Sequence, residues 1–526
     1  MRRFFKLLLF CLLSALNLSA QTFPVGQFEL DGAVRNLQLM GKIHNSQSFL
    51  VRPIYTGYND SFFRLIDTSS TIGFKKLRFK GGKNGLTILP LLWTSKFNSH
   101  HPYGWNDQEM IAAKGFQSNF TAGFHLKLGP LSAQLQPNYF YAANPNFDYN
   151  NSYGQVTNGI QSHLTLGQSS LRLNLGPISL GISNENLWWG PGQYSALLLS
   201  NNAPGFKHIT FNTTKPIKTH IGSFEFQIFG GRLEEDTTQT NALYENFFLK
   251  AVSHKKDWRY MNGMAISYQP VFLKGFFIGA TRSFQLYGED FDLQEPNFMQ
   301  KYVPVLSALF KNNTINEDAK ARDQQLSIFL RWLLEKAHAE FYFEYGYNDH
   351  KANLRDFALA PVHAAAYILG SKKLIQIPRN EWIELNFELT QMAQNNDYLV
   401  RNAGNWYIHG LIGQGLTNQR QILGAGSGMG NNVQTLSAAW LNGFKKIGFK
   451  LQRIQQDPRG FRGDFSTLGL TNDQWSDFAI GLFGRWNYGK WMASAEIQQV
   501  SSRNYAWSAG KRASNFYGLL NIGYTW

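Results

Sequence analysis

The segment IELNFEL, residues 383–389, carries the pattern that decides the fold. Its apolar side chains alternate with polar ones: Ile383, Leu385, Phe387 and Leu389 against Glu384, Asn386 and Glu388. Successive side chains of a β-strand point to opposite faces, so we expect a strand between one apolar and one polar environment. Residues 171–175, 224–228 and 339–345 alternate in the same way. The pattern therefore predicts an all-β fold.

Two all-β folds produce such alternation. A soluble sandwich buries the apolar face, whereas a transmembrane barrel turns it toward lipid. The alternating segments run for about ten residues and recur across roughly 450 residues, which is typical of outer-membrane barrels. Aromatic residues make up 15% of the chain and charged residues only 16%. We therefore expect residues 71–526 to form a transmembrane antiparallel outer-membrane β-barrel with long extracellular loops.

The end of the chain favours the same interpretation. Alternate residues place one face together: Phe516, Gly518, Leu520, Ile522, Tyr524 and Trp526. A last strand that ends on an aromatic residue resembles the signal that such barrels present to the barrel-insertion machinery, which is an expected partner. Two near-identical stretches, LGPLS at 128–132 and LGPIS at 175–179, predict tight periplasmic turns.

The N-terminus has the order of a secretory signal peptide. Basic residues at Arg2, Arg3 and Lys6 precede an apolar run at 7–16 and the small pair Ser19-Ala20. The alternative is a buried N-terminal helix. We expect residues 1–20 to be removed, and with them the only cysteine, Cys11. Disulfides, thiolate chemistry and cysteine-ligated metals are then excluded from the mature chain.

Alternation is weaker in residues 21–70. We expect a small N-terminal periplasmic helical element there, with a helix at Val34 to Met40. Farther along, the long polar segment 285–323 predicts an external loop or partial plug, with a short helix around Phe298 to Lys311. Arg331 and Tyr342 are expected to face inward by parity and to obstruct the lumen.

The positive charge limits the expected partners. The formal charge of +15 falls to +12 when the three basic residues of the signal peptide leave. Such a surface suits acidic polysaccharide or the phosphates of outer-membrane lipid and lipopolysaccharide. We expect no nucleic acid partner for an exported chain.

Motifs that carry catalysis are absent from the sequence. There is no G-x-S-x-G, no H-E-x-x-H and no phosphate loop, and the glycine-rich stretch 424–430 lacks the dinucleotide spacing. The pair His100-His101 is expected to be an exposed polar loop, not a metal site. Four carboxylates have the types that glycoside hydrolysis uses, but carboxylates facing the lumen are ordinary in barrels: Glu340, Glu344, Glu384 and Glu388. We expect no enzyme, no cofactor and no metal.

The densest unusual stretch is NENLWWGPGQYS at 184–195, followed by LLLSNNAPGF at 197–206. It resembles the capsule assembly protein Wzi family, whose members carry a W-G-P-G segment before an L-L-L-S-N-N-A-like run. HPYGWND at 101–107 and YIHG at 407–410 are similar to other parts of that family. The resemblance covers about residues 30–526.

The resemblance implies a closed barrel of about eighteen strands with the small N-terminal element. It also implies a lectin-like role in the outer membrane, holding capsular or other secreted polysaccharide. Sugar faces stack on aromatic rings and sugar hydroxyls need polar partners. The candidate glycan-binding residues that offer this mixture are Trp105, Asn106, Asp107, Trp188, Trp189, Asn201 and Asn202.

A structural interpretation of the same residues stays open. Tryptophans near a Gly-Pro turn more often brace a barrel rim or lie in the interfacial belt. Two other functions also stay open: a substrate-specific channel, which an open lumen would reveal as conductance, and an accessory barrel of a protein-secretion or motility system.

Overall fold

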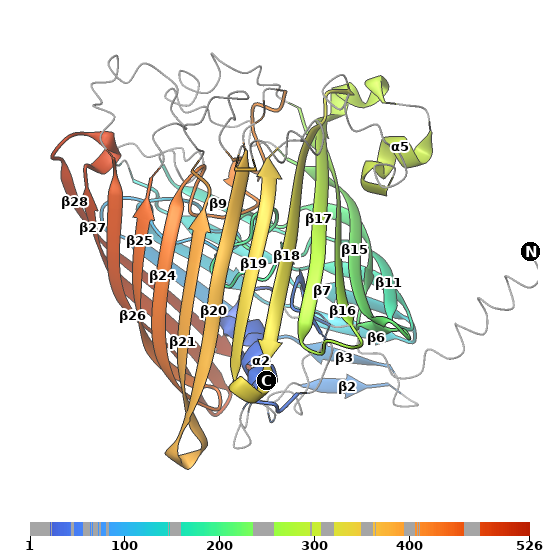
Figure 1. The fold of residues 1–526 in the computed structure, drawn as a ribbon, viewed down its shortest axis with the longest axis horizontal. Helices are drawn as coiled ribbons and strands as arrows, with labels where there is room; N and C mark the ends of the chain where they lie inside the picture. Colours follow the sequence, from blue (N-terminus) through green and yellow to red (C-terminus); the bar gives the residue numbers. More distant parts are fainter. Residues whose placement is uncertain are drawn as a thin grey trace, which may run out of the picture.

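A computed structural model describes residues 22–526 outside the following gaps: 23, 44–46, 56–63, 65, 67–71, 73–74, 80–83, 146, 148–158, 235–256, 295–296, 307–319, 349–360, 363, 394–405, 408, 410 and 457–473. Its main element is one antiparallel sheet of 24 strand segments that curves into a barrel (Figure 1). The predicted signal peptide lies outside the described residues.

The first part of the wall consists of short segments that continue one another. They are β3 (Gly85–Ile88) with β4 (Leu91–Asn98), β5 (Gly115–Thr121) with β6 (Phe124–Leu128), β7 (Leu131–Leu135) with β8 (Asn138–Ala142), β9 (Gln161–Thr165) with β10 (Ser170–Leu175), β11 (Ile178–Ser183), and β13 (Lys207–Thr213) with β14 (Ile217–Lys218). Strand β2 (Lys76–Arg78) pairs only with β3, beside the wall.

The second part of the wall consists of longer strands. They are β15 (Gly222–Leu233), β16 (Arg259–Pro270), β17 (Phe276–Tyr287), β18 (Asp323–Leu334), β19 (Ala339–Asn348), β20 (Ala365–Ile377), β21 (Glu381–Gln391), β24 (Asn432–Asn442), β25 (Lys445–Gln455), β26 (Ser476–Tyr488), β27 (Trp491–Arg503) and β28 (Arg512–Tyr524).

The barrel closes between its first and last strands. Strand β28 pairs with β27 on one side and with β4 on the other, from Tyr517 opposite Asn98 to Tyr524 opposite Leu91. Counting each of the five continuous pairs as one strand and setting β2 aside, the 24 segments make eighteen strands in the described part of the chain. The predicted barrel of about eighteen strands is confirmed.

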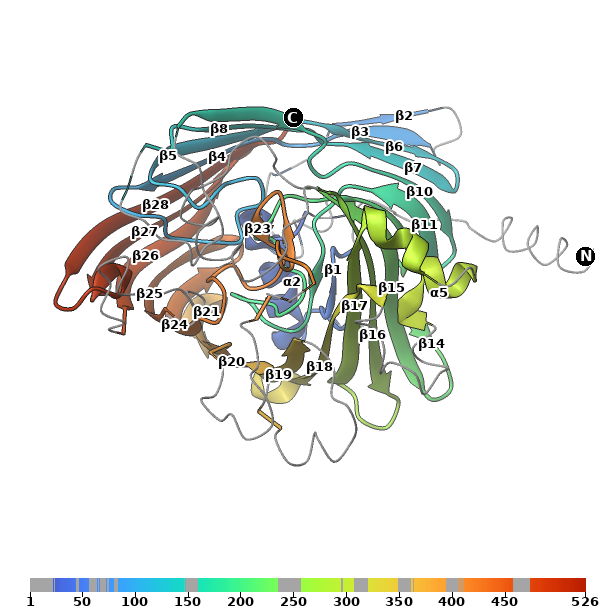
Figure 2. The ribbon, with the colours of Figure 1, turned by 90° about the horizontal axis from the view of Figure 1, so that it is seen from above.

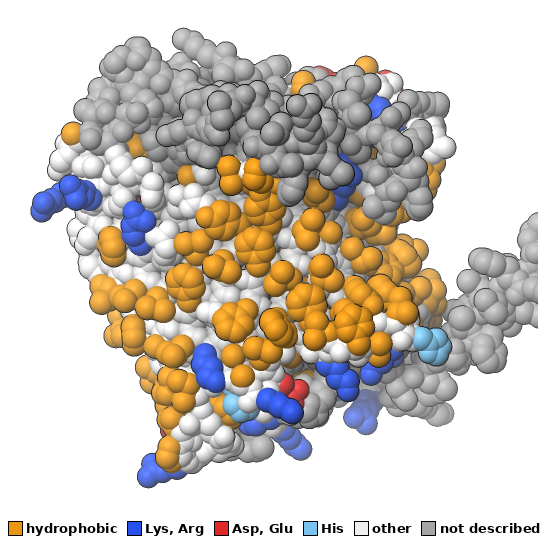
Figure 3. Space-filling view, in the orientation of Figure 1, with side chains coloured by type: hydrophobic (Ala, Val, Ile, Leu, Met, Phe, Trp, Pro, Cys, Tyr) orange, Lys and Arg blue, Asp and Glu red, His pale blue; other side chains and the backbone are white. Residues whose placement is uncertain are grey.

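The alternation of β21 separates the barrel from a soluble sandwich. Its polar residues are the buried ones: Glu384 is 1% exposed and Glu388 is 2% exposed. Its apolar residues Leu385 and Phe387 are 39% and 38% exposed. Figure 3 shows such hydrophobic side chains spread over the outer wall. The sheet therefore turns its apolar face outward, as a wall in lipid requires.

The ends of the barrel differ in their connections. The predicted Gly-Pro turns are two-residue hairpins, and Gly129 and Gly176 have φ of 60° and 62°, the positive values that primed hairpin turns need. Strand β28 and the chain end reach this same side (Figure 1). Tight turns mark the periplasmic side of an outer-membrane barrel, so the long connections are extracellular.

Several segments lie inside the ring of strands (Figure 2). They include η1 (Gln27–Glu29), α2 (Leu30–Leu39), β1 (Val51–Arg52), β12 (Trp188–Trp189), β22 (Thr417–Asn418) and β23 (Gln421–Ile422). Helix α2 begins earlier than the predicted Val34, and it lies inside the barrel instead of forming the predicted periplasmic element, because its polar side chains pair with inward-facing wall residues. Among the described residues, no helix has the length and apolar character needed to cross a membrane.

The connection between β17 and β18 contains η2 (Gly288–Leu293) and α5 (Phe298–Tyr302). Helix α5 corresponds to the start of the helix predicted for Phe298 to Lys311; the part beyond residue 306 lies outside the described residues. Short 3-10 turns join other strands: η4 (Glu335–Ala337), η5 (Pro378–Asn380) and η8 (Tyr505–Trp507).

Candidate functional site

The W-W-G-P-G segment is a loop that folds into the lumen. It leaves β11 and returns to β13, and its Trp188 and Trp189 pair with Arg52 and Val51 in the two-stranded sheet β1–β12. Its glycines are required by the turn. Gly190 has φ of 109°, and a Cβ at Gly192 would lie 1.9 Å from the carbonyl oxygen of Ser195. Only glycine allows the chain to reverse so tightly here.

Glu388 of the wall holds this turn. Its carboxylate accepts hydrogen bonds from the backbone N–H of Gln193 at 2.6 Å and of Tyr194 at 3.1 Å. It also accepts the Tyr342 hydroxyl at 2.8 Å. Neighbouring Glu344 similarly accepts from the Ser327 hydroxyl at 2.8 Å. These two carboxylates anchor the lumen loop and the wall.

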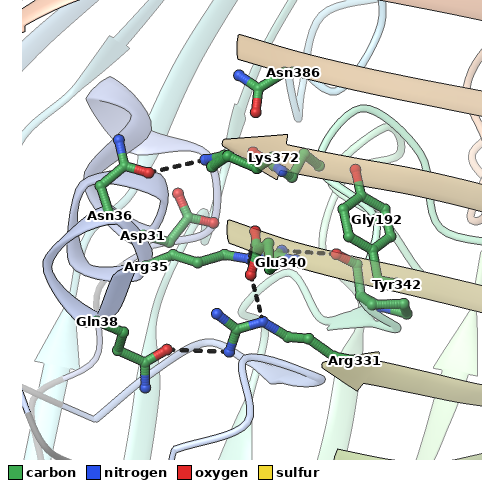
Figure 4. Close-up of polar contacts among 12 residues, drawn as sticks. Asp31, Arg35, Asn36, Gln38, Gly192, Arg331, Glu340, Tyr342, Lys372 and Asn386 are labelled. Carbon is green, nitrogen blue, oxygen red and sulfur yellow. Dashed lines mark hydrogen bonds and ion pairs between the residues drawn. The ribbon is translucent and has the colours of Figure 1, made fainter. Parts of the chain in front are cut away.

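Helix α2 is fixed to the wall by buried charges (Figure 4). The Arg35 guanidinium lies 2.7 Å from Glu340, which also pairs with Arg331 at 2.7 Å. Arg35 further donates to the carbonyl of Pro191 at 2.7 Å, and Arg331 donates to Gln38 at 3.0 Å. Arg35 thus joins the helix, the wall and the W-W-G-P turn. The parity prediction that Arg331 faces inward is confirmed.

A second set of charges fixes the same helix to neighbouring strands. Asn36 donates to Glu384 at 2.5 Å and accepts from Lys372 at 3.0 Å. Lys446 bridges Glu384 at 3.1 Å and Glu29 at 2.7 Å. The neighbouring cations Lys446 and Arg485 lower the pKa of Glu29. All four carboxylates that have glycosidase-like types therefore have partners in the barrel.

Two of the predicted glycan residues are interior braces. Trp189 is fully buried, its ring centroid is 5.3 Å from that of Phe229, and its indole N–H donates to Gln227 at 2.8 Å. Asn202 is 7% exposed and donates to the carbonyl of Ile422 at 2.9 Å. Both side chains are buried in this structure, where they brace the interior of the barrel.

Four other predicted residues meet around one cavity. Trp105, Asn106, Trp188 and Asn201 line a space of about 220 Å³ between the N-terminal segment and the wall. Tyr194 holds two of them in place, because its backbone carbonyl accepts the Trp105 indole N–H at 3.0 Å and the Asn106 side-chain amide at 2.7 Å. Asn201 donates to the Asn106 carbonyl at 3.0 Å. We call this space the lumen chamber.

Polar wall residues form the opposite side of the lumen chamber: Lys446, Lys450, Gln452, Glu496, Gln498 and Tyr517. Prediction from sequence missed them, although strand parity alone indicates which face points inward. Lys446 and Gln452 are six residues apart on β25, so the chamber runs along roughly 20 Å of the wall.

Several residues that line the lumen chamber carry buried polar atoms without a hydrogen-bond partner. Within the described residues, the indole N–H of Trp188, the Nε2 of Gln193 and the Oδ1 atoms of Asn106 and Asn201 have no protein partner. The set combines donors and acceptors, which is what hydroxyl groups require. One face of Trp188 is covered by the Arg52 guanidinium, 4.4 Å from the ring centroid, whereas the Trp105 ring is half-buried.

Asp107 contributes to a different space. It lines a neighbouring cavity of about 100 Å³ that shares Asn106 and Asn201 with the lumen chamber. Its carboxylate is 2.5 Å from the Lys96 ammonium. Burial raises the pKa of Asp107 more than Lys96 lowers it. The ion pair of Asp107 with Lys96 therefore fastens the loop that carries Trp105 to strand β4.

Glu109, two residues farther along, was missed by the sequence analysis. It is buried and accepts from the Thr165 hydroxyl at 3.0 Å and from Asn138 at 3.4 Å. No cation contacts it in the described part of the chain, and burial raises its pKa to about 7. Nothing in the sequence around Glu109 indicated that its side chain would be buried.

The histidine pair is not the exposed loop that we predicted. His101 is fully buried against the rings of Tyr505 and Trp475. Burial, with the adjacent His100 adding to it, lowers the pKa of His101 to about 3. Among the described residues, no group of three His, Cys, Asp or Glu side chains is placed to hold a metal ion.

Comparison with known proteins identifies relatives of the fold. The structure of Wzi from Escherichia coli, titled an outer membrane protein involved in group 1 capsule assembly and a carbohydrate binding beta-barrel, is similar with a TM-score of 0.63. It is 13% identical, and the match covers 96% of this chain and all of that one. OccAB3 of Acinetobacter baumannii gives a TM-score of 0.43 at 10% identity, over 84% of this chain and 98% of that one.

No curated protein matches the sequence. The profile of the family described as capsule assembly protein Wzi matches residues 98–515, which is most of the chain. The matched range includes the W-W-G-P-G loop and the wall from β5 to the first residues of β28. A closed barrel with an apolar outer face agrees with this match. The chain belongs to the capsule assembly protein Wzi family, and its place is the bacterial outer membrane.

Proposed function

We propose that this barrel holds capsular or other secreted polysaccharide at the cell surface, as a lectin and without catalysis. The family to which the chain belongs is named for capsule assembly, and its E. coli structural neighbour is titled a carbohydrate-binding barrel. The observation that carries the proposal is the lumen chamber, where Trp105 and Trp188 lie beside unpaired amide atoms of Asn106 and Asn201.

The chemistry of the lumen chamber supports a sugar. A pyranose has apolar C–H faces that pack on an aromatic ring, and hydroxyls that both donate and accept. In this proposal the half-buried Trp105 supplies the ring, Trp188 and Gln193 donate, and Asn106 and Asn201 accept. Trp189 and Asn202 support the loop from behind.

The pairing of the lumen carboxylates supports a role without catalysis. A glycosidase needs two carboxyl groups that reach the scissile bond, one of them able to donate a proton. Glu340 and Glu384 pair with cations, and Glu388 accepts two backbone N–H groups. We infer that these residues hold the lumen segments in place.

The channel alternative is less well supported. A diffusion channel needs a water-filled path along the barrel axis. Here α2, β1 and the W-W-G-P-G loop lie across the lumen (Figure 2). No observation favours the accessory-barrel alternative over polysaccharide attachment.

The test uses a clean deletion strain. Cells without the protein should still make and export polymer but release it into the medium, so the retained fraction should fall while the total stays constant. Complementation with Trp332→Ala, which removes an indole from the outer wall, should restore retention. Unchanged retention in the deletion strain would reject the proposed function.

A further inference from the structure

Outward-facing residues at the extracellular ends of β16 and β17 are buried. Lower on the same faces, Ile266 and Ile278 are each 41% exposed, as expected for side chains that face lipid. Nearer the extracellular ends, Asn262 and Phe284 are only 1% exposed and Leu286 is fully buried. These three differ from the exposed pair by even numbers of residues, so they point outward as well. Another part of the chain must therefore cover the outside of the barrel here.

The cover is the connection between β17 and β18. We call its described residues, 288–294 and 297–306, the outer flap. The backbone N–H of Val305 donates to the Asn262 side chain at 3.1 Å, and the Tyr260 hydroxyl donates to the carbonyl of Tyr302 at 2.6 Å. The Phe291 ring stacks on Trp258 with centroids 5.9 Å apart. The outer flap thus folds against the outer wall, beside the rim where Figure 1 shows α5.

The outer flap carries an exposed apolar surface of its own. Four large side chains lie within ten residues, and their exposed fractions are high: Leu293 58%, Phe298 66%, Met299 43% and Tyr302 41%. A soluble surface rarely gathers such residues without a partner. The ammonium of Lys301 lies 5.7 Å from the Phe291 ring centroid and 6.0 Å from that of Tyr302. Aromatic and lysine side chains together are typical of the membrane interface.

We propose that the outer flap is a membrane-interface element whose apolar side chains insert into the outer leaflet of the outer membrane. The partner is lipid because the flap continues the lipid-facing belt. It packs on the same strand faces that present Ile266 and Ile278 to lipid, only a few residues nearer the extracellular side. An amphipathic segment at this depth lies in the interface and buries its apolar face among acyl chains.

A fluorophore placed on the outer flap tests the proposal. Cys11, the only native cysteine, lies in the predicted signal peptide, so Met299→Cys gives one labelling site in the mature chain. Ala509→Cys is the matched control, because Ala509 is exposed in the extracellular connection between β27 and β28. Both proteins are labelled with an environment-sensitive dye and reconstituted, without other proteins, into vesicles of phospholipid and lipopolysaccharide.

The label at position 299 should shift its emission to the blue. Lipids with a quencher near the headgroup should quench it at least threefold more than the label at position 509. Phe298→Asp in the Met299→Cys background should reduce this quenching, while heat-modifiability shows that the barrel is folded. Equal quenching at both positions would overturn the proposal. So would a label that is shielded in native membranes but not in vesicles, since a protein would then be the partner.

Discussion

The two sides of the barrel wall treat the lumen segments differently. Strands β18 to β21 hold helix α2 through buried ion pairs, with Glu340 between Arg35 and Arg331. They hold the W-W-G-P turn through backbone hydrogen bonds to Glu388. The parts of β25 to β28 nearer the extracellular side lie farther from the same segments, and the lumen chamber lies between them. The ion pair of Lys450 and Glu496 in this chamber is partly exposed. One side therefore closes the barrel, and the other leaves room for a ligand.

Removing the helix should abolish this difference. The intact protein should conduct poorly in planar bilayers, because α2 and the inward loop lie across the lumen. Deletion of residues 27–43 removes η1 and helix α2 from the lumen, and stable conductance steps should therefore appear. Heat-modifiability of the deleted protein controls for folding. Large, stable channels in the intact protein would favour the channel function instead.

Breaking the buried ion pairs that hold helix α2 should lower the free energy of unfolding more than breaking an ion pair at the lumen chamber. Glu340→Ala leaves Arg35 and Arg331 buried without their carboxylate, and breaking a buried pair costs about 3–5 kcal/mol. Glu496→Ala is the control, since its side chain is 21% exposed, and an ion pair in contact with water contributes at most ~1 kcal/mol. Denaturant midpoints of the purified barrels give both values. Equal losses would show that the two sides do not differ.

The wall could be predicted from the sequence and the lumen could not. Strand alternation is a local property, so residues 383–389 were enough to identify β21, and the recurrence of such segments along the chain predicted that their apolar face points outward. Parity also placed Arg331 inside. It could not identify the partner of Glu340, because Arg35 lies 305 positions away on a helix whose location inside the barrel has no local signal.

The candidate site shows the same limit. The W-W-G-P-G motif pointed to the correct loop, yet Trp188 and Trp189 have different surroundings. Trp189 packs on Phe229, whereas Trp188 lines the lumen chamber. Which of two adjacent rings faces a cavity depends on the pairing of β1 with β12, and Val51 and Arg52 are far from the motif in sequence.

A change of pH should act on the loop beside the lumen chamber through Glu109. Its pKa is raised to about 7 from an ordinary 4.5, so the folded state holds a proton that the unfolded state releases. The contribution to stability is therefore full below pH 4.5 and is lost as the pH rises through about 7, and it amounts to about 3 kcal/mol.

Glu109→Gln should remove this part of the pH dependence. The variant keeps an acceptor for Thr165 and has no proton to lose. Denaturant midpoints at pH 4.5 and pH 8 should differ less in the variant than in the unchanged protein. The same difference in both would show that Glu109 is ionised in the folded state.

The smallest expected effect decides whether the lumen chamber binds the glycan. Trp105→Ala should weaken polysaccharide binding by ~1–2 kcal/mol, the scale of an aromatic contact, or roughly 5- to 30-fold in Kd. Trp332→Ala should leave binding unchanged, because that ring is 43% exposed on the outer wall. Since the Trp105 indole also holds the Tyr194 carbonyl, Trp105→Phe separates the two roles. Phenylalanine keeps a ring for stacking but loses the N–H, so it should recover most of the affinity if the ring contacts sugar. Equal weakening by alanine and phenylalanine would instead assign Trp105 to the support of the loop, and the sugar would have to bind elsewhere.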